Sequence, residues 1–129
     1  MKRVLIVDDS AVMRGAIAQV LRAQGYEIAG EAGDADKALA LYGSLRPDLV
    51  TMDIVMPSPS GDLDPETAGL EAVRRIRKSD PKARIIVISA MTQKDFMTEA
   101  IRAGARDFVA KPFNPMRLRE ALARAEEPF

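Results

Sequence analysis

Five short runs of β-branched and other apolar residues alternate with five longer stretches of helical spacing in this chain. The runs cover residues 3–8, 26–32, 48–53, 84–89 and 106–110, and the longer stretches cover 10–25, 34–45, 68–80, 92–104 and 114–127. Because parallel strands must be joined by long crossovers, this alternation favours a parallel sheet with helices on both faces. The length of 129 residues suits one domain, and we predict a single α/β domain over residues 1–129.

The ends and faces of several helical stretches are marked in the sequence. Asp34 and Asn114 stand where a side chain can cap a helix, and Pro115 follows at the first helical position. Gly25 and Gly104 stand where two helices are expected to end. The residues expected to share an apolar face are Val12, Ile17, Val20 and Leu21 in the first helix, and Leu70, Val73 and Ile76 in the third.

One segment breaks the alternation. Residues 56–69 contain three prolines, two glycines and three acids, and no basic residue. We predict an extended loop at about 57–68, after the third strand. Its acids, Asp62, Asp64 and Glu66, raise the idea of a second cation site, but their spacing lacks the ligand set of a calcium loop. A mobile surface loop is the simpler interpretation.

Composition removes several classes of function. The 19 basic and 19 acidic side chains balance, so we expect no binding to nucleic acid or to a membrane surface. The chain has no cysteine and no histidine, which excludes disulfides, thiol ligands and an imidazole base or phosphoryl carrier. The apolar run from Val4 to Val7 is too short for a signal peptide, and no segment suits a membrane span. We expect a soluble, cytoplasmic protein.

Chemically active side chains stand at the ends of four predicted strands. Asp8 and Asp9 follow the first strand, Asp53 ends the third, Ser89 ends the fourth, and Lys111 follows the fifth. In the flavodoxin-like strand order 2-1-3-4-5 these four strands are neighbours, and doubly wound sheets bind ligands beyond the carboxyl ends of their strands. We therefore predict that three carboxylates, a hydroxyl and an ammonium group line one crevice.

This set of groups indicates phosphoryl chemistry. Three carboxylates in one crevice repel one another, and a hard divalent cation relieves the repulsion. Oxygen ligands suit Mg²⁺, which keeps water positions that a phosphate can take. Lys111 would add positive charge and Ser89 a hydrogen-bond donor. Because a carboxylate can accept a phosphoryl group as an acyl phosphate, the pattern indicates a site that holds a phosphoryl group on a carboxylate.

The segments VLIVDDSAVMR, PDLVTMDIVMP, IIVISAM and AGARDFVAKPF resemble the receiver domains of two-component response regulators, in particular stand-alone chemotaxis regulators. The resemblance covers the chain apart from the long loop. It implies a phosphorylation-activated switch, not a conventional enzyme, that takes a phosphoryl group on Asp53 from a histidine kinase. It would catalyse its own phosphorylation and slow dephosphorylation. Output would run through an effector protein, such as a flagellar motor switch component, and a phosphatase would be a further partner.

The resemblance also implies a role for each site residue. Asp9, Asp53 and the backbone carbonyl of Val55 would bind Mg²⁺ directly, and Asp8 would help largely through water. Lys111 would pair with phosphoryl oxygens, in a chain segment where the bond to the following proline is often cis. Ser89 would move to hydrogen-bond the phosphoryl group.

Two features depart from the family pattern. The loop after Pro57 is several residues longer than usual and follows the acceptor, so we hypothesise that it shields the acyl phosphate or biases the choice of partner. Position 108 is Phe where many chemotaxis regulators have Tyr. Phe108 can still turn inward behind Ser89, but it brings no hydroxyl to a partner.

Structural interpretations remain for some of these residues. Asp8 and Asp9 can be explained as caps of the first helix, and Ser89 as a cap of the fourth helix in place of Thr92. Phe108 can be a core residue, a switch residue or both. The face of the fourth helix on which Met97 lies is ambiguous between the core and a partner contact.

Other functions also remain as alternatives. A phosphate sink or an adaptor in a phosphorelay outside chemotaxis fits the same residues. An aspartyl-phosphate phosphatase of the haloacid-dehalogenase type would need an acid two positions after its nucleophile, where this chain has Val55. A dinucleotide-binding domain would need glycines in the first turn, where the acids Asp8 and Asp9 would repel a pyrophosphate.

Overall fold

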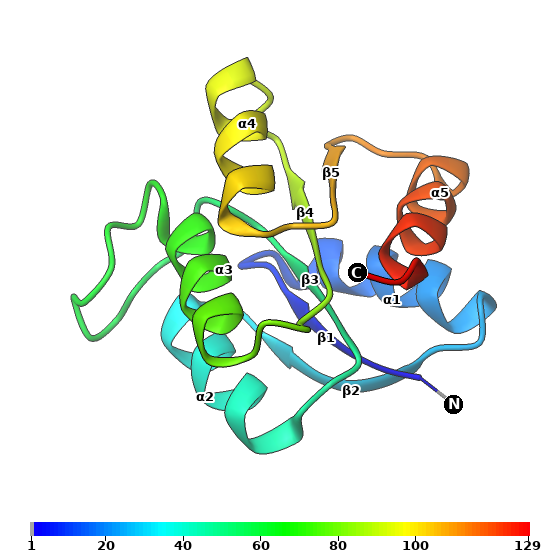
Figure 1. Cartoon of the computed structure of the whole chain (residues 1–129), viewed down its shortest axis with the longest axis horizontal. Helices are drawn as coiled ribbons and strands as arrows, with labels where there is room; N and C mark the ends of the chain where they lie inside the picture. The colour runs from blue at the N-terminus through cyan, green and yellow to red at the C-terminus, as the bar shows by residue number, and fades with distance from the viewer. Residues whose placement is uncertain (1) are drawn as a thin grey trace.

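The computed structural model describes residues 2–129 and has the predicted topology (Figure 1). Within these residues five parallel strands form one sheet in the order β2-β1-β3-β4-β5. The strands are β1 (Arg3–Val7), β2 (Glu27–Ala32), β3 (Leu49–Met52), β4 (Ile85–Ser89) and β5 (Asp107–Ala110). The helices are α1 (Ala11–Ala23), α2 (Ala35–Leu45), α3 (Ala68–Ser79), α4 (Lys94–Ala103) and α5 (Pro115–Glu126). Every predicted element is therefore present.

Helices cover both faces of the sheet and form two separate cores. Leu5, Val50 and other strand residues pack with α2, α3 and α4 on one face. Val4, Ile6 and their neighbours pack with α1 and α5 on the other. The division follows from the alternation of side chains along a strand. Every residue of β3 and β4 is buried, which confirms the prediction from their apolar runs.

Most predicted helix ends are confirmed. The Asp34 side chain accepts a hydrogen bond from the Lys37 N–H, and Asn114 caps α5 with Pro115 in the first turn. Gly104 is the C-cap of α4 and has a φ of 115°. Gly25 has a φ of 89° and directly follows Gln24, the C-cap of α1. These two glycines adopt a left-handed backbone that other residues rarely take.

One helix face was predicted wrongly in part. Ile17 and Leu21 are buried and Val20 is partly buried, but Val12 is 85% exposed. Met13, four residues before Ile17, packs against the core in the first turn instead. Residues that lie three or four apart share a helix face, so position 13, not 12, continues the stripe of Ile17 and Leu21.

The predicted long loop is irregular, but it is tied to the rest of the molecule. The Asp36 carboxylate, in the first turn of α2, accepts hydrogen bonds from Ser58 Oγ (2.9 Å), Ser60 N (2.7 Å) and Ser60 Oγ (3.0 Å). These bonds, first of all that from the Ser60 N–H, lower the pKa of Asp36. Leu63 is buried in the core beside α2 and α3. The loop projects from the edge of the molecule in Figure 1, and it is anchored at its start by Ser58 and Ser60 and in its middle by Leu63.

The carboxylates that gather in the described part of the chain do not include those of the loop. Among residues 2–129, the acids whose oxygens come close enough to share a metal ion are Asp8, Asp9 and Asp53, and none of the loop acids joins them. Within these residues, Asp62, Asp64 and Glu66 therefore form no cluster of three acids. No helix within the same residues has the length and apolar character needed to cross a bilayer.

Candidate functional site

The predicted site residues meet at the carboxyl edge of the sheet. The pairing of Val7 with Met52 brings Asp8 beside Asp53, and the pairing of Ser89 with Ala110 brings Lys111 to the same edge. Asp8, Asp53 and Ser89 are buried, whereas Asp9 is exposed. The carboxyl edge of one parallel sheet thus brings together residues that lie up to 103 positions apart in the chain.

Lys111 lies between two of the carboxylates. Its Nζ donates to Asp8 Oδ2 at 2.6 Å and to Asp53 Oδ2 at 3.0 Å. Burial alone would lower the pKa of Lys111, but the hydrogen bonds and charges of Asp8 and Asp53 outweigh it and raise the pKa. The ammonium group therefore stays charged, and its side chain is held inward with 14% of its surface exposed.

Asp53 is less well compensated. Its Oδ1 accepts from the Ile54 N–H at 2.8 Å, and its Oδ2 accepts from Lys111. Burial nevertheless raises the pKa of Asp53, and the charge of Asp8 adds to the rise, although Lys111 opposes it. The negative charge on Asp53 is therefore unfavourable in the folded protein unless further positive charge is present.

The three carboxylates suit a hard divalent cation. One ligand oxygen each of Asp8, Asp9 and Asp53 can be chosen so that all lie within 4.8 Å of one another. Three acids face one ammonium group, so the site has an excess of negative charge and oxygen donors, which is the environment that Mg²⁺ prefers. Val55 lies two residues beyond Asp53 at the surface. The residues present therefore fit Mg²⁺.

The alternative capping roles are wrong. The cap of α1 is Ser10, whose side chain accepts from the Met13 N–H, so neither Asp8 nor Asp9 caps that helix. Asp8 Oδ1 instead accepts from the Ser10 N–H at 2.9 Å. The residue that precedes α4 is Gln93, without a side-chain cap, so neither Ser89 nor Thr92 caps that helix.

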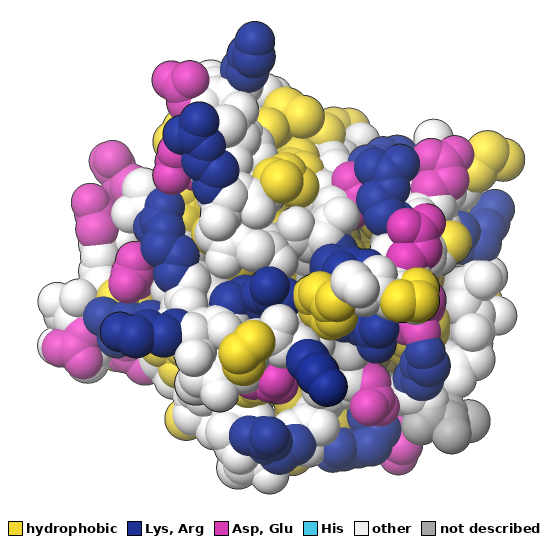
Figure 2. All heavy atoms as spheres, viewed as in Figure 1, with side chains coloured by type: hydrophobic (Ala, Val, Ile, Leu, Met, Phe, Trp, Pro, Cys, Tyr) yellow, Lys and Arg dark blue, Asp and Glu magenta, His cyan; other side chains and the backbone are white. Residues whose placement is uncertain are grey.

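Ser89 ends β4 at the carboxyl edge of the sheet, and Phe108 lies in the neighbouring strand β5. Ser89 Oγ accepts from the Met91 N–H at 3.1 Å and shapes the turn after β4. Phe108 is buried in the core on the α4 side, which agrees with a core role and leaves the switch role as a prediction. On α4, Met97 and Ile101 are 40% and 51% exposed, so Met97 does not belong to the core. Hydrophobic side chains gather beside α4 in Figure 2, among interspersed acidic and basic groups.

Gly69 is a site feature that the sequence reasoning missed. Its N–H donates to the Ile54 carbonyl at 2.8 Å, and a Cβ at this position would lie 1.7 Å from the Asp53 carbonyl oxygen. Only glycine allows the first turn of α3 to contact the backbone of Asp53. The signal available in the sequence was a glycine at the point where helical spacing resumes after the loop.

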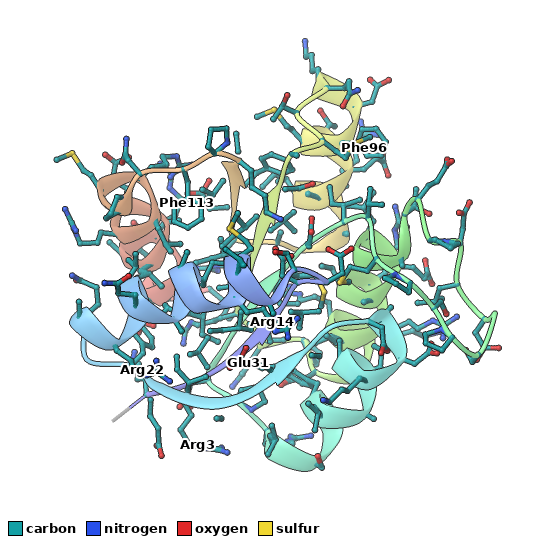
Figure 3. The ribbon with its side chains drawn as sticks, turned by 180° about the vertical axis from the view of Figure 1, so that it is seen from behind. Arg3, Arg14, Arg22, Glu31, Phe96 and Phe113 are labelled. Atoms are coloured by element: carbon teal, nitrogen blue, oxygen red, sulfur yellow. The ribbon has the colours of Figure 1, made fainter. Side chains whose placement is uncertain are left out.

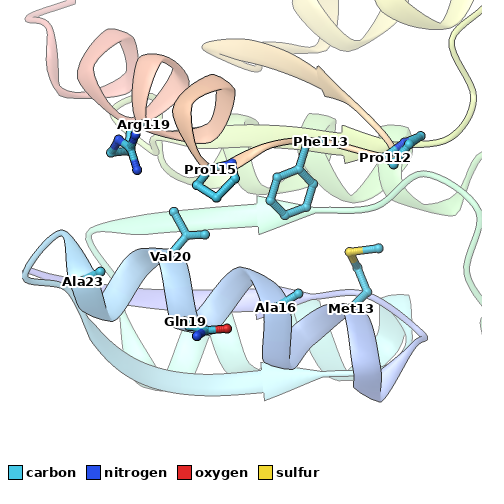
Figure 4. Close-up of a pocket in the computed structure, with 9 residues that line it drawn as sticks. All are labelled: Met13, Ala16, Gln19, Val20, Ala23, Pro112, Phe113, Pro115 and Arg119. Atoms are coloured by element: carbon cyan, nitrogen blue, oxygen red, sulfur yellow. The ribbon is translucent and has the colours of Figure 1, made fainter.

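A groove between α1 and α5 was also missed. It has a volume of about 450 Å³ and is lined mainly by apolar groups, among them Met13, Val20, Pro112 and Phe113 (Figure 4). Pro112 directly follows Lys111, through a cis peptide bond of the kind common in the family that the sequence resembles. The groove therefore begins beside the acidic site. It was hidden from the sequence because it joins α1 and α5, which are far apart in the chain.

The fold and site together define a doubly wound α/β domain with three carboxylates and a lysine gathered at the carboxyl edge of its sheet, and comparison with known proteins gives its family. The family model for the response regulator receiver domain matches residues 4–123, and the chain belongs to this family. It is 48% identical over 126 residues to the chemotaxis protein CheY of Thermotoga maritima, covering 98% of both chains. It is also 48% identical over 124 residues to the protein CcdB of Bacillus subtilis, covering 96% of this chain and 97% of the relative.

A solved structure shows the same fold. The chain resembles a chain in the CheX–CheY–BeF3–Mg complex of Borrelia burgdorferi with a TM-score of 0.88 at 28% identity. The match covers 98% of this chain and 90% of the Borrelia chain. The relatives and this structure confirm the flavodoxin-like fold and the resemblance to stand-alone chemotaxis regulators that the sequence motifs indicated.

Proposed function

We propose that residues 1–129 form a receiver domain that accepts a phosphoryl group on Asp53 from a histidine kinase and signals by binding another protein, in the cytoplasm and in a chemotaxis pathway. The observation that carries the proposal is the arrangement of Lys111 between Asp8 and Asp53, with Asp9 close enough to share a cation. The similarity to CheY of Thermotoga maritima supports the pathway.

The two oxygens of Asp53 would have different roles. The Ile54 N–H holds Oδ1, whereas Oδ2 faces Lys111, so Oδ2 is the oxygen that would attack the phosphorus. The phosphorus–nitrogen bond of the donor would break as the acyl phosphate forms. Lys111 would then neutralise a phosphoryl oxygen, and Ser89 would donate a hydrogen bond to another. Slow hydrolysis by water would return the free carboxylate.

Magnesium bound by Asp9, Asp53 and the Val55 carbonyl, with Asp8 acting largely through water, would neutralise charge on the phosphoryl oxygens. The chain's own contribution is to hold the carboxylates at the edge of a rigid sheet and to keep Asp53 buried. Because transfer needs mainly positioning and neutralisation, the domain would catalyse its own phosphorylation without being a conventional enzyme.

Three kinds of protein partner follow from this function. The donor would be a histidine kinase, and the apolar groove lined by Met13 and Pro112 would offer it a contact surface, because Pro112 directly follows Lys111 of the site. The effector, such as a flagellar motor switch component, would contact a surface that includes Met97 and Ile101 of α4. The Borrelia CheY in complex with CheX supports a further partner of that type, a phosphatase.

The experiment is incubation with a small phosphodonor and Mg²⁺, followed by measurement of the intact mass. We expect the mass of one phosphoryl group to be added to the unsubstituted chain and to Asp62→Asn, which changes an exposed loop acid. Asp53→Asn should show no added mass, and chelation of Mg²⁺ should suppress labelling of every variant. Labelling that persists in Asp53→Asn would show that another residue accepts the group.

The second candidate is a phosphate sink or adaptor in a phosphorelay outside chemotaxis. The chain is as similar to the protein CcdB, whose name does not refer to chemotaxis, as it is to CheY of Thermotoga maritima, with 48% identity to each. This similarity favours the second candidate. Capture of partners by the phosphorylated and unphosphorylated forms separates the two. An effector that binds only the phosphorylated form supports a signalling output, whereas exchange of the phosphoryl group with a kinase alone supports a sink.

A further inference from the structure

Arg14 links α1, the end of β2 and the acidic turn after β1. Its Nε donates to Glu31 Oε1 at 2.9 Å, and its Nη1 donates to the backbone carbonyl oxygen of Asp8 at 2.7 Å. Figure 3 shows Arg14 and Glu31 together where α1 passes over β2. The Arg14 side chain is 20% exposed, although it carries a charge. The guanidinium group is therefore held at two points, one on a side chain and one on the main chain.

The surroundings of Arg14 leave room for this arrangement. A Cβ at Gly33 would lie 3.4 Å from Arg14 Nη1, which is an ordinary van der Waals contact, so Gly33 lies beside the guanidinium without obstructing it. Glu31 is 45% exposed, and an ion pair this exposed adds little stability by itself. Its contact with Arg14 Nε therefore orients the guanidinium more than it stabilises the fold.

The carbonyl that Arg14 holds belongs to the peptide group between Asp8 and Asp9. A peptide group is planar, so fixing this oxygen also fixes the direction in which the chain enters Asp9. Other contacts already fix Asp8, because its N–H donates to Ala32 O at 3.0 Å and its carboxylate accepts from Ser10 N and Lys111 Nζ. Asp9 is exposed, and the position of its carboxylate depends on this peptide.

We propose that Arg14 is a positioning residue for the Mg²⁺ site, acting through the peptide that joins Asp8 and Asp9. The proposal rests on the proposed function, since it requires that these acids hold the cation. Arg14 reaches its two acceptors from two different nitrogens of a planar fork, whereas a lysine would have to reach both from one nitrogen. Glu31 already compensates the charge of Arg14, so the contribution of Arg14 is geometric.

The test compares Arg14→Lys with Arg22→Lys. Arg22 is exposed on the same helix and makes no ion pair within residues 2–129, so it is a matched control. Mg²⁺ affinity is measured by titration calorimetry on the unphosphorylated chain, after circular dichroism confirms that each variant is folded. We expect Arg14→Lys to weaken Mg²⁺ binding about 10-fold, as changes around metal ligands commonly do, and Arg22→Lys to have no effect. At saturating Mg²⁺ the rate of phosphorylation of Arg14→Lys should return to that of the unsubstituted chain.

Glu31→Gln provides a second variant that leaves Arg14 and α1 in place. It should weaken Mg²⁺ binding in the same direction but less, and the double variant should bind no more weakly than Arg14→Lys alone, because both changes act on one contact. Mg²⁺ affinity of Arg14→Lys equal to that of the unsubstituted chain would overturn the inference, as would additive effects in the double variant. Failure of the unsubstituted chain to bind Mg²⁺ would overturn the proposed function itself.

Discussion

Replacing Asp53 with Asn should make the metal-free protein more stable. Asp53 faces two other carboxylates within 4.8 Å and one ammonium group at 3.0 Å. At an effective dielectric constant of about 20, a carboxylate at this limiting distance of 4.8 Å repels Asp53 by about 3.5 kcal/mol, and Lys111 attracts it by about 5.5 kcal/mol. The balance is about 1.5 kcal/mol against the charge on Asp53, and the burial that raises its pKa acts in the same direction.

Asn has nearly the same shape and keeps an acceptor for the Ile54 N–H, so Asp53→Asn removes the charge with little change in packing. We expect the free energy of unfolding in a chelating buffer to rise by about 1–3 kcal/mol. With an m-value of about 2 kcal/mol per molar urea, this corresponds to an increase of roughly 0.5–1.5 M in the urea midpoint. Asp62→Asn, in the exposed part of the loop, should leave the midpoint within about 0.5 kcal/mol of its original value.

Saturating Mg²⁺ should reduce this difference in stability, and should reverse it where the difference is about 1 kcal/mol. Binding at 100 times the dissociation constant stabilises the unsubstituted chain by about 2.7 kcal/mol, whereas Asp53→Asn has lost a ligand and should gain less. The assay is urea unfolding followed by circular dichroism, with and without Mg²⁺. A lower midpoint for Asp53→Asn in the chelating buffer would refute the reasoning, because it would mean that Lys111 fully compensates the buried acids.

Three further predictions concern stability away from the site. Tyr42→Phe removes the hydrogen bond of 2.6 Å to Asp80 and should cost about 1–2 kcal/mol. The hydrogen bond from Tyr42 is the main cause of the lowered pKa of Asp80. The stability that this bond gives is therefore present above the ordinary carboxyl pKa and is lost as the pH falls through the lowered pKa of Asp80. NMR titration should show that the pKa of Asp80 rises in Tyr42→Phe. Thr51→Val should stabilise the protein by about 1–2 kcal/mol in thermal unfolding, because the buried Thr51 hydroxyl has no hydrogen-bond partner within residues 2–129; a lower melting temperature would contradict this. Leu63→Ala should cost about 2–3 kcal/mol and speed proteolysis within the loop, whereas a loop without a packing role would show neither change.

The sequence predicted the fold well because each level of the pattern agrees with the others. The apolar runs, the capping residues Asp34 and Asn114 and the terminal glycines all mark the same boundaries. The gathering of Asp8, Asp53 and Lys111 could also be predicted, since parallel strands bring their carboxyl ends to one edge. The error at Val12 arose in the first turn, where a shift of one position changes the face.

Features that depend on contacts between distant segments could not be predicted. The anchoring of Ser58 and Ser60 by Asp36 joins residues separated by 22 and 24 positions, and no local pattern marks it. The contact of Arg14 with the Asp8 carbonyl is similarly invisible, because it uses a backbone atom. In the sequence Arg14 is one charged residue among many on an amphipathic helix.

The contact of Gly69 with the backbone of Asp53 fixes the position where the loop must end, whereas the length of the loop before it can vary. The chain that leaves Asp53 must return to touch its carbonyl group, and the single hydrogen atom of Gly69 makes that return possible. The exposed positions of the loop, such as Gly61 and Asp62, can therefore accept inserted residues while Gly69 and the anchors Ser58, Ser60 and Leu63 keep their places. An engineer who wished to insert a reporter peptide close to the phosphorylation site would choose the tip of this segment and leave Gly69 untouched.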